Sequence, residues 1–211
     1  RGEIDPDEFK RFRLQNGIYG QRQEGEQMVR VKIPWGGLTA EQLELLASIA
    51  EETPRKVVHV TTRQNMQFYF LKLDRVPGLL RRLAEGGLTT SEACGNAIRN
   101  VTACHKAGVC PNEAFDVTPY AEATARYFLR NPMNQNLPRK FKVSFSGCEE
   151  GCGLPVIHDI GAMAVLRTEG DRTLRGFRLY LGGGLGPHPK AAQLLEEFTP
   201  EEALLVTLAA V

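Results

Sequence analysis

Residues 28–50, MVRVKIPWGGLTAEQLELLASIA, change from a strand pattern to a helix pattern across one turn. In the first part, aliphatic residues alternate with Arg30 and Lys32, which is the period of two of a half-buried strand. After PWGG, Thr39 and Gln42 form a capping-box pattern, and the apolar spacing of LELLASIA fits an amphipathic helix. The sequence therefore predicts a strand that directs Arg30 away from the core, followed by a helix.

The neighbouring residues extend this pattern. Residues 57–61 and 66–73 read as two strands, and residues 76–85 read as a helix that two glycines end. The order β-α-β-β-α indicates a small α+β unit. The charged residues 1–25 in front of it are interrupted by glycines and are expected to form an extended arm.

A second unit is expected from residue 89 on. A Thr-Pro pair at residue 118 begins a predicted helix, and strands are expected at residues 162–166 and 177–181. Two helices are expected after the stretch GGGLG, and the last one opens at Thr199 and runs to the end without a stop signal. We therefore expect the chain to be a piece of a longer polypeptide or a subunit.

Another strand is predicted where polar and apolar residues alternate in KFKVSF, residues 140–145. Side chains two residues apart on a strand point to the same face. Lys140 and Lys142 are therefore expected side by side on the polar face of this strand.

Composition excludes several classes of function. The 26 Lys and Arg residues nearly balance the 25 Asp and Glu residues, so no global charge attracts nucleic acid or an anionic membrane. No apolar run approaches the roughly 20 residues of a membrane helix, and the first residues are too polar for a signal peptide. We expect a cytoplasmic protein that binds neither nucleic acid nor membrane.

Four of the five cysteines fall into two spaced pairs. Cys104 and Cys110 form C-x5-C, and Cys148 and Cys152 form C-x3-C. Four thiolates brought together in this way hold an iron–sulfur cluster or zinc, although a five-residue gap is wide for a zinc knuckle. Four unrelated buried cysteines are the remaining alternative. Cys94 is expected to be a core residue.

The sequence resembles the sulfite and nitrite reductases that contain sirohaem and a [4Fe–4S] cluster. Six stretches carry the resemblance in family order, namely VRVKIPWGG, VTTRQNMQF, CGNAIRNVTAC, LPRKFK, SGCEEGCG and LGGGLG. The resemblance implies an α+β protein in which a ferredoxin-like half-domain, residues 26–88, follows the arm of residues 1–25. A mixed α/β domain that binds sirohaem and the cluster is then expected over residues 89–211.

The resemblance also implies roles for individual residues. The cluster ligands would be the four paired cysteines, with Cys152 sharing its sulfur with the sirohaem iron. Cationic groups would surround the substrate anion, polarise its oxygens and relay protons; they are Arg30, Arg99, Lys140 and Lys142. Further residues would contact sirohaem, whose carboxylates suit arginine forks and backbone N–H groups; they are Arg63, Gln67, Arg139 and Gly183.

The implied activity is the multi-electron reduction of sulfite to sulfide. Nitrite reduction to ammonia and a non-catalytic, metal-stabilised binding module are the alternatives. Relatives specialised for nitrite tend to carry asparagine at the position of Lys142, which favours sulfite. The expected partners are the small anion, an electron donor such as ferredoxin or a flavoprotein, and a second half or subunit.

Overall fold

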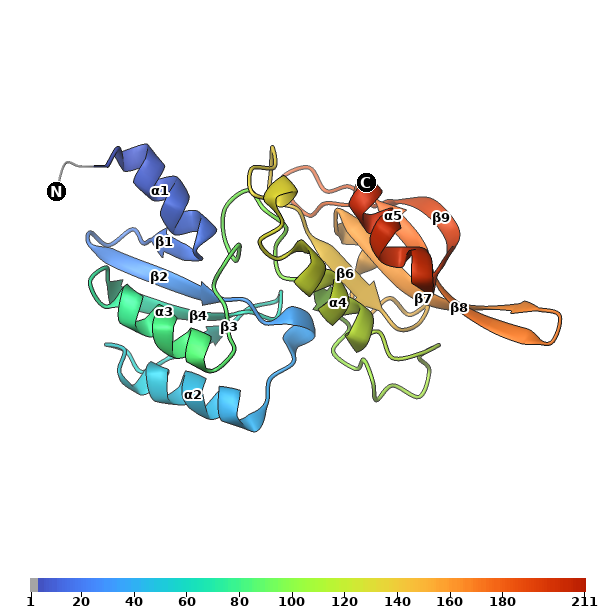
Figure 1. Ribbon diagram of the computed structural model, residues 1–211, viewed down its shortest axis with the longest axis horizontal. Helices are drawn as coiled ribbons and strands as arrows, with labels where there is room; N and C mark the ends of the chain where they lie inside the picture. Colours follow the sequence, from blue (N-terminus) through green and yellow to red (C-terminus); the bar gives the residue numbers. More distant parts are fainter. Residues whose placement is uncertain (1–3) are drawn as a thin grey trace. The chain divides into compact units, whose positions relative to one another are not determined.

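The computed structural model describes residues 4–211 and divides into two compact units. Unit 1 comprises the residues up to Asn100 together with Leu129–Lys140, and unit 2 comprises Val101–Phe128 and Phe141–Val211. Residues 89–100 and 129–140, which were expected in the second domain, therefore pack with unit 1. Figure 1 shows helices and sheets in both units, which confirms the expected α+β class.

Unit 1 is built on a four-stranded antiparallel sheet in the order β1-β2-β4-β3. Its elements are α1 (Pro6–Gln15), β1 (Ile18–Gly20), β2 (Glu26–Val31), α2 (Ala40–Glu51), β3 (Val58–Val60), β4 (Met66–Lys72) and α3 (Val76–Glu85).

Helices α2 and α3 cover one face of this sheet (Figure 1). Val31 and Phe68 of the sheet are fully buried against Leu46 of α2 and Leu83 of α3. Helix α2 begins at the predicted capping box, in which the Thr39 hydroxyl accepts from the backbone N–H of the third helical residue at 3.2 Å. Because side chains alternate along β2, Arg30 turns toward the opposite face.

Unit 2 is built on a five-stranded mixed sheet in the order β5-β6-β7-β8-β9. The first three strands run parallel and the last three antiparallel. Its elements are β5 (Thr102–Ala103), α4 (Thr118–Phe128), β6 (Val143–Ser146), β7 (Ile160–Glu169), β8 (Arg172–Leu181), β9 (Gln193–Pro200) and α5 (Leu204–Ala210).

An aromatic cluster forms part of the core of unit 2. The ring of Phe177 on β8 lies 5.7 Å from that of Phe145 on β6, 5.0 Å from that of Tyr120 on α4 and 5.4 Å from that of Phe115. Edge contacts of this kind add to the burial of the apolar area. The cluster fixes the central strands of the sheet, and β6 leads directly into the second cysteine pair.

The prediction of an extended arm over residues 1–25 is wrong for Pro6–Gln15, which form helix α1. The Asp5 carboxylate accepts from the backbone N–H groups of Asp7 and Glu8 at 3.0 Å, and Pro6 occupies the first helical position. The glycines that were read as helix breakers begin at Gly17, after the helix has ended. Residues 1–3 of the expected arm lie outside the described residues.

The strand expected at residues 140–145 forms only from Val143 on, so the placement of Lys140 and Lys142 on it is wrong. Strand β6 begins at Val143, and all four of its residues are buried. It lies between the parallel strands β5 and β7, and a strand in that position has no solvent-facing side. Both lysines precede it, and the backbone N–H of Lys142 donates to the Asp159 carboxylate at 2.8 Å.

The first of the two helices expected at the end of the chain does not form, because its residues form strand β9. Its sequence QLLEEF contains good helix formers, yet it pairs with β8 through the register Phe177↔Thr199. Propensity is a weak preference that tertiary pairing overrides. The last helix forms as α5, but it begins at Leu204 rather than near Thr199.

Candidate active site and cysteine loops

Two predicted substrate-binding arginines of unit 1 meet at one backbone oxygen. Arg30 Nη1 donates to the Ala93 carbonyl at 3.2 Å, and Arg99 Nη1 donates to the same oxygen at 2.7 Å. Neither guanidinium forms an ion pair within residues 4–211. Two like charges held this close repel each other, so an anion bound beside them would be stabilised.

Gln67 holds Arg30 from the neighbouring strand. The two residues are directly opposite in the β2–β4 ladder. With the amide oxygen turned toward the guanidinium, Gln67 accepts from Arg30 Nε and Nη2 at 2.8 Å. Gln67 is buried, and its amide also bonds the Tyr69 hydroxyl. The structure therefore brings together two predicted residues, Arg30 and Gln67, that were assigned to different roles.

Tyr19 and Cys94 complete this cluster, and sequence reasoning missed both as neighbours of the arginines. The Tyr19 hydroxyl accepts from Arg99 Nη2 at 3.4 Å, and its ring centroid lies 5.5 Å from the Arg30 guanidinium carbon. Cys94 is fully buried, as expected. Burial raises the pKa of its thiol to about 11, while Arg30, Arg99 and a hydrogen bond with Tyr19 act in the opposite direction. The thiol is therefore neutral at physiological pH.

Arg63 is anchored to the same loop. Its guanidinium donates to the Asn100 carbonyl, and the Asn100 amide donates back to the Arg63 carbonyl at 3.0 Å and to the Ile33 carbonyl at 2.6 Å. Asn100 follows Arg99 directly, so these bonds hold the loop of residues 92–100 against β2 and the β3–β4 turn. Asn100 belongs to no periodic pattern, so only its place in the stretch CGNAIRNVTAC could have indicated its role.

The remaining predicted cations belong to other segments of the chain. Arg139 and Lys140 are exposed at the end of the segment 129–140 of unit 1. Lys142 is half-buried and belongs to unit 2. The four predicted catalytic cations are thus divided between the units, with three in unit 1.

The four paired cysteines all belong to unit 2 and lie near the ends of two parallel strands. Cys104 follows β5, and its backbone N–H donates to the Phe145 carbonyl of β6 at 2.9 Å. Cys148 follows β6 by two residues. The loop that carries Cys110 returns to the same place, because the Ala114 N–H donates to the Gly147 carbonyl at 2.7 Å. Because β5 and β6 run parallel, the segments that carry the two pairs leave the sheet at the same end.

The donor set fits an iron–sulfur cluster in its chemistry. Partial burial raises the pKa of the Cys148 thiol, and the charges of Glu150, Cys110 and Cys152 raise it further, which places three of the thiols within electrostatic range. Four cysteine thiolates are the usual ligands of a [4Fe–4S] cluster. Among residues 4–211, no three metal-ligating side chains are already gathered in a metal-binding arrangement.

Two glycines support the segment around Cys152. A Cβ on Gly153 would lie 2.1 Å from the Phe145 carbonyl oxygen. A Cβ on Gly183, a predicted sirohaem contact, would lie 2.6 Å from the carbonyl oxygens of Val156 and His158. Real Cβ atoms do not approach so closely, so backbone packing explains why both positions are glycine.

Gly153→Ala is expected to destabilise unit 2 by about 1–3 kcal/mol, the range for overpacking a close contact. The added methyl group must push the Cys152 segment away from β6, so cluster content per chain should fall together with the melting temperature. Gly184→Ala is the matched control, because a Cβ there meets nothing within 4 Å. Thermal unfolding and labile-sulfide content of both variants check this, and equal behaviour of the two would contradict it.

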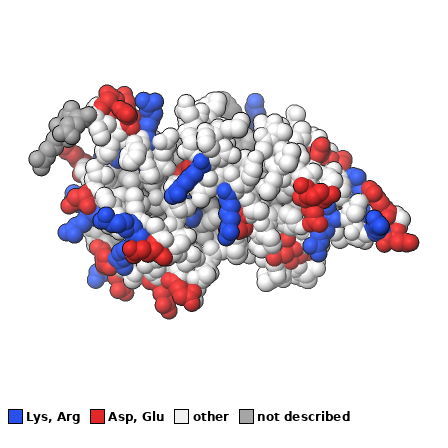
Figure 2. Space-filling view, viewed as in Figure 1, with Lys and Arg blue, Asp and Glu red and all other residues white. Residues whose placement is uncertain are grey.

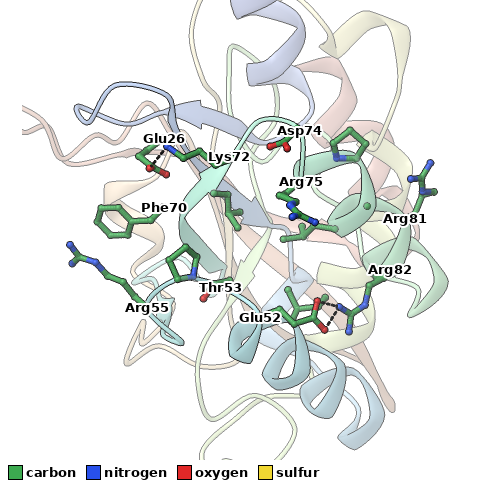
Figure 3. Close-up of a pocket in the computed structure, with 16 residues that line it drawn as sticks. Glu26, Glu52, Thr53, Arg55, Phe70, Lys72, Asp74, Arg75, Arg81 and Arg82 are labelled. Carbon is green, nitrogen blue, oxygen red and sulfur yellow. Dashed lines mark hydrogen bonds and ion pairs between the residues drawn. The ribbon is translucent and has the colours of Figure 1, made fainter.

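Two of the cavities among the described residues are lined by unit 1. One of about 440 Å³ is lined by Arg30, Tyr19, Tyr69 and five neighbours, and therefore adjoins the arginine cluster. The other, of about 1030 Å³, contains none of the predicted site residues. Figure 3 shows the ion pairs in its wall, in which Lys72 lies 2.7 Å from Glu26 and Arg82 lies 2.6 Å from Glu52.

The surface charges are mixed. Figure 2 shows Lys and Arg interspersed with Asp and Glu over the visible face, without a large patch of one sign. This face and the balanced composition thus show no general excess of positive charge. Within residues 4–211, no helix combines the length and apolar character needed to span a bilayer.

Comparison with known proteins adds the family. Residues 94–211 match the family described as nitrite and sulphite reductase 4Fe-4S domain. The chain belongs to this family. Residues 19–86 match the nitrite/sulfite reductase ferredoxin-like half domain. These matches confirm the predicted resemblance and the order of a ferredoxin-like half-domain followed by a cluster-binding domain with a mixed sheet.

Relatives in the family act on either anion. The chain is 32% identical, over 92% of its length, to the assimilatory ferredoxin-dependent nitrite reductase of Haloferax mediterranei. It is 31% identical, over 93% of its length, to a ferredoxin sulfite reductase of Mycolicibacterium paratuberculosis. It covers 35% and 38% of those proteins, so it spans about a third of the length of the curated relatives it matches.

A solved structure shows the same fold. The structure of the Mycobacterium tuberculosis NirA protein superimposes with a TM-score of 0.87 at 31% identity, over 99% of this chain and 40% of that one. The family is thereby fixed as that of nitrite and sulfite reductases, whereas the relatives divide between the two substrates.

Proposed function

We propose that the chain forms part of a sirohaem-dependent enzyme that reduces sulfite to sulfide. The observation that carries this proposal is the pair of arginines, Arg30 and Arg99, that share the Ala93 carbonyl without a carboxylate partner in residues 4–211. A small oxyanion supplies the missing negative charge. The family description names a 4Fe-4S domain, which supports a cluster in the same enzyme.

Cys104, Cys110, Cys148 and Cys152 would hold the [4Fe–4S] cluster, with Cys152 also next to the sirohaem iron. When bound, the two groups supply stored electrons and an open iron position for the anion. The protein supplies the remaining functions of binding, orienting and protonating the substrate. The ends of the parallel strands β5 and β6 give the thiols a rigid base for this purpose.

Arg30, Arg99, Lys140 and Lys142 would bind the anion and deliver protons to its oxygens. Guanidinium groups keep their charge at any physiological pH and orient an oxyanion through two N–H groups at once. Lysine ammonium groups act as compact charges and as proton donors. The charges weaken each S–O bond because they stabilise the negative charge that develops on the oxygen as water leaves.

Further residues would hold the sirohaem carboxylates. They are Arg63, Gln67, Arg139 and Gly183. The bonds between Arg63 and Asn100 support this role, because a guanidinium held by a backbone carbonyl needs little reordering when a carboxylate binds. Gln67 would act here through its hold on Arg30 as well as directly.

Nitrite is the second candidate substrate, because the Haloferax mediterranei relative reduces nitrite by its name. Ferredoxin is the proposed electron donor, since both relatives are named for it. Steady-state reduction of each anion by the holoenzyme with an artificial donor tests the proposal. Turnover of sulfite with the higher kcat/KM supports it, and turnover of neither anion overturns it.

Lys142→Asn is expected to lower kcat/KM for sulfite by about tenfold to a hundredfold and to leave nitrite little changed. Sulfite is largely a dianion near neutral pH and nitrite is a monoanion, so a second cation stabilises sulfite more. A charged hydrogen bond contributes about 1.5–3 kcal/mol, and 1.36 kcal/mol corresponds to a factor of ten. Kinetics with both anions decide this, and equal losses for the two would refute the role of Lys142 in discrimination.

A further inference from the structure

A buried ion pair lies beside the arginine cluster, outside every residue assigned above. Lys32 Nζ lies 3.4 Å from Glu92 Oε2, and the side chains are only 3% and 2% exposed. Lysine and glutamate are almost never buried to this extent unless they are paired and hydrogen-bonded. Burial lowers the pKa of Lys32, and Glu92 opposes that shift.

The Glu92 carboxylate accepts hydrogen bonds from three donors. Its Oε1 accepts from the Arg130 backbone N–H at 2.7 Å and from Gln135 Nε2 at 2.6 Å, while Oε2 faces Lys32. Its own backbone N–H donates to the carbonyl of Gln15, the last residue of helix α1, at 2.6 Å. A carboxylate has about four acceptor sites, so this one is nearly saturated by parts of unit 1 that are distant in sequence.

The backbone of Glu92 is itself unusual. Its φ of +59° is in the left-handed region, which a residue with a side chain rarely adopts. Such a conformation persists only where the surroundings enforce it. The bonds of the Glu92 carboxylate and backbone N–H provide this enforcement.

The pair connects the segments that carry three of the predicted substrate cations. Lys32 lies two residues after Arg30 on the chain, and its Nζ also donates to the Ile98 carbonyl at 3.2 Å, next to Arg99. The positive charge of Arg99 adds to the effect of burial in lowering the pKa of Lys32. Through Glu92, the pair is bonded to the segment 129–140, which ends at Lys140.

We infer that Lys32 and Glu92 are positioning residues that hold Arg30, Arg99 and the Lys140 segment in register for the anion; this inference rests on the function proposed above. An apolar pair would fill the same space but would not fix the orientation of the segments that it joins. Hydrogen bonds to one carboxylate fix this orientation, because each donor must approach the oxygen within a limited range of angles. The pair touches no predicted substrate position and acts through the segments that it joins.

Glu92→Ala and Lys32→Met in the holoenzyme test this, with Leu46→Ala as the matched control. Leu46 is a buried core residue of α2, so its loss lowers stability without removing a hydrogen bond of the Glu92 carboxylate or of Lys32 Nζ. The first readout is the dissociation constant of sulfite, from absorbance titration of cofactor-loaded protein. The second is peptide-level hydrogen exchange over residues 92–100 and 129–140.

Glu92→Ala is expected to raise the sulfite dissociation constant by at least about tenfold, since small displacements of positioned groups have large effects. Lys32→Met should raise this dissociation constant by about threefold or more, because Glu92 keeps its hydrogen bonds from the Arg130 backbone and the Gln135 amide. Both variants should speed exchange in the two segments, and Leu46→Ala should lower the melting temperature with both readouts unchanged.

A dissociation constant equal to that of the wild type in Glu92→Ala, despite a lower melting temperature, overturns the inference. If Glu92→Ala does not load its cofactors, Lys32→Met decides by the same criterion. Wild-type holoenzyme that binds neither sulfite nor nitrite instead refutes the proposed function, so the two failures are distinguishable.

Discussion

Replacing Cys148 by serine should abolish the visible absorbance of the cluster and the reductase activity together. Cys148 lies two residues after β6 and within electrostatic range of Cys110 and Cys152. Loss of one thiolate leaves an iron without its ligand, and a serine hydroxyl does not replace it at neutral pH. Cys110→Ser should have the same effect. Absorbance and labile-sulfide content of anaerobically purified variants measure the result.

Cys94→Ser is the control for this prediction. Cys94 is fully buried, lies in unit 1 and neighbours the arginines, so it has no part in the cysteine loops. Its replacement by a side chain of similar size should leave the cluster absorbance intact. Loss of the cluster in Cys94→Ser, combined with its retention in Cys104→Ser, would show that the ligand assignment is wrong.

Replacing Arg30 by methionine should lower kcat/KM for sulfite by about a hundredfold, since charged hydrogen bonds contribute about 1.5–3 kcal/mol. Methionine keeps the packing of the aliphatic stem, so the loss reports the guanidinium. The change also removes the repulsion between Arg30 and Arg99, so stability should be kept or slightly raised. Steady-state kinetics and thermal unfolding measure the two effects.

Arg55→Met is the matched control for Arg30→Met. Arg55 is an exposed arginine of the same unit, with its guanidinium 3.7 Å from the Phe70 ring centroid. Its loss should leave kcat/KM within about twofold of the wild type, as expected for a surface charge away from the site. Equal losses in the two variants would mean that Arg30 contributes only to the general field of the protein.

Local signals were sufficient for α2, α3, β2 and β4 of unit 1, but not for β1, which lies in the expected arm. Helix α3 spans Val76–Glu85, as its apolar period and the following glycines predicted. Helix α2 begins at the predicted cap, and β4 covers most of the predicted strand. In these elements the capping residues, the hydrophobic period and the tertiary packing all favour the same structure.

Predictions failed where long-range pairing or a missed cap decides the structure. Strand β9 forms because β8 offers an open edge, which is invisible in a helix-forming sequence. Strand β6 is buried between two neighbours, so the alternation of lysines before it did not mark a polar face. Helix α1 was not predicted, because the expectation of an extended arm rested on the charged residues and the later glycines, whereas the Asp5 cap and Pro6 begin a helix.

The same limits apply to the candidate site. Motifs identified Arg30 and Arg99, but their shared carbonyl depends on the folded loop of residues 92–100. Lys32 alternates with aliphatic residues and was expected on a polar face, yet that face is covered and Lys32 is buried. Its partner Glu92 lies in a loop without any period, so only the tertiary structure reveals the pair.

The visible absorption spectrum of the anaerobically purified protein, recorded before and after addition of sulfite, tests the central claim most directly. The protein should be produced in cells that make sirohaem. Sirohaem bands superimposed on the broad absorbance of a cluster, with a shift of the bands when sulfite is added, are the predicted result. A colourless protein that contains zinc instead of iron would contradict the account.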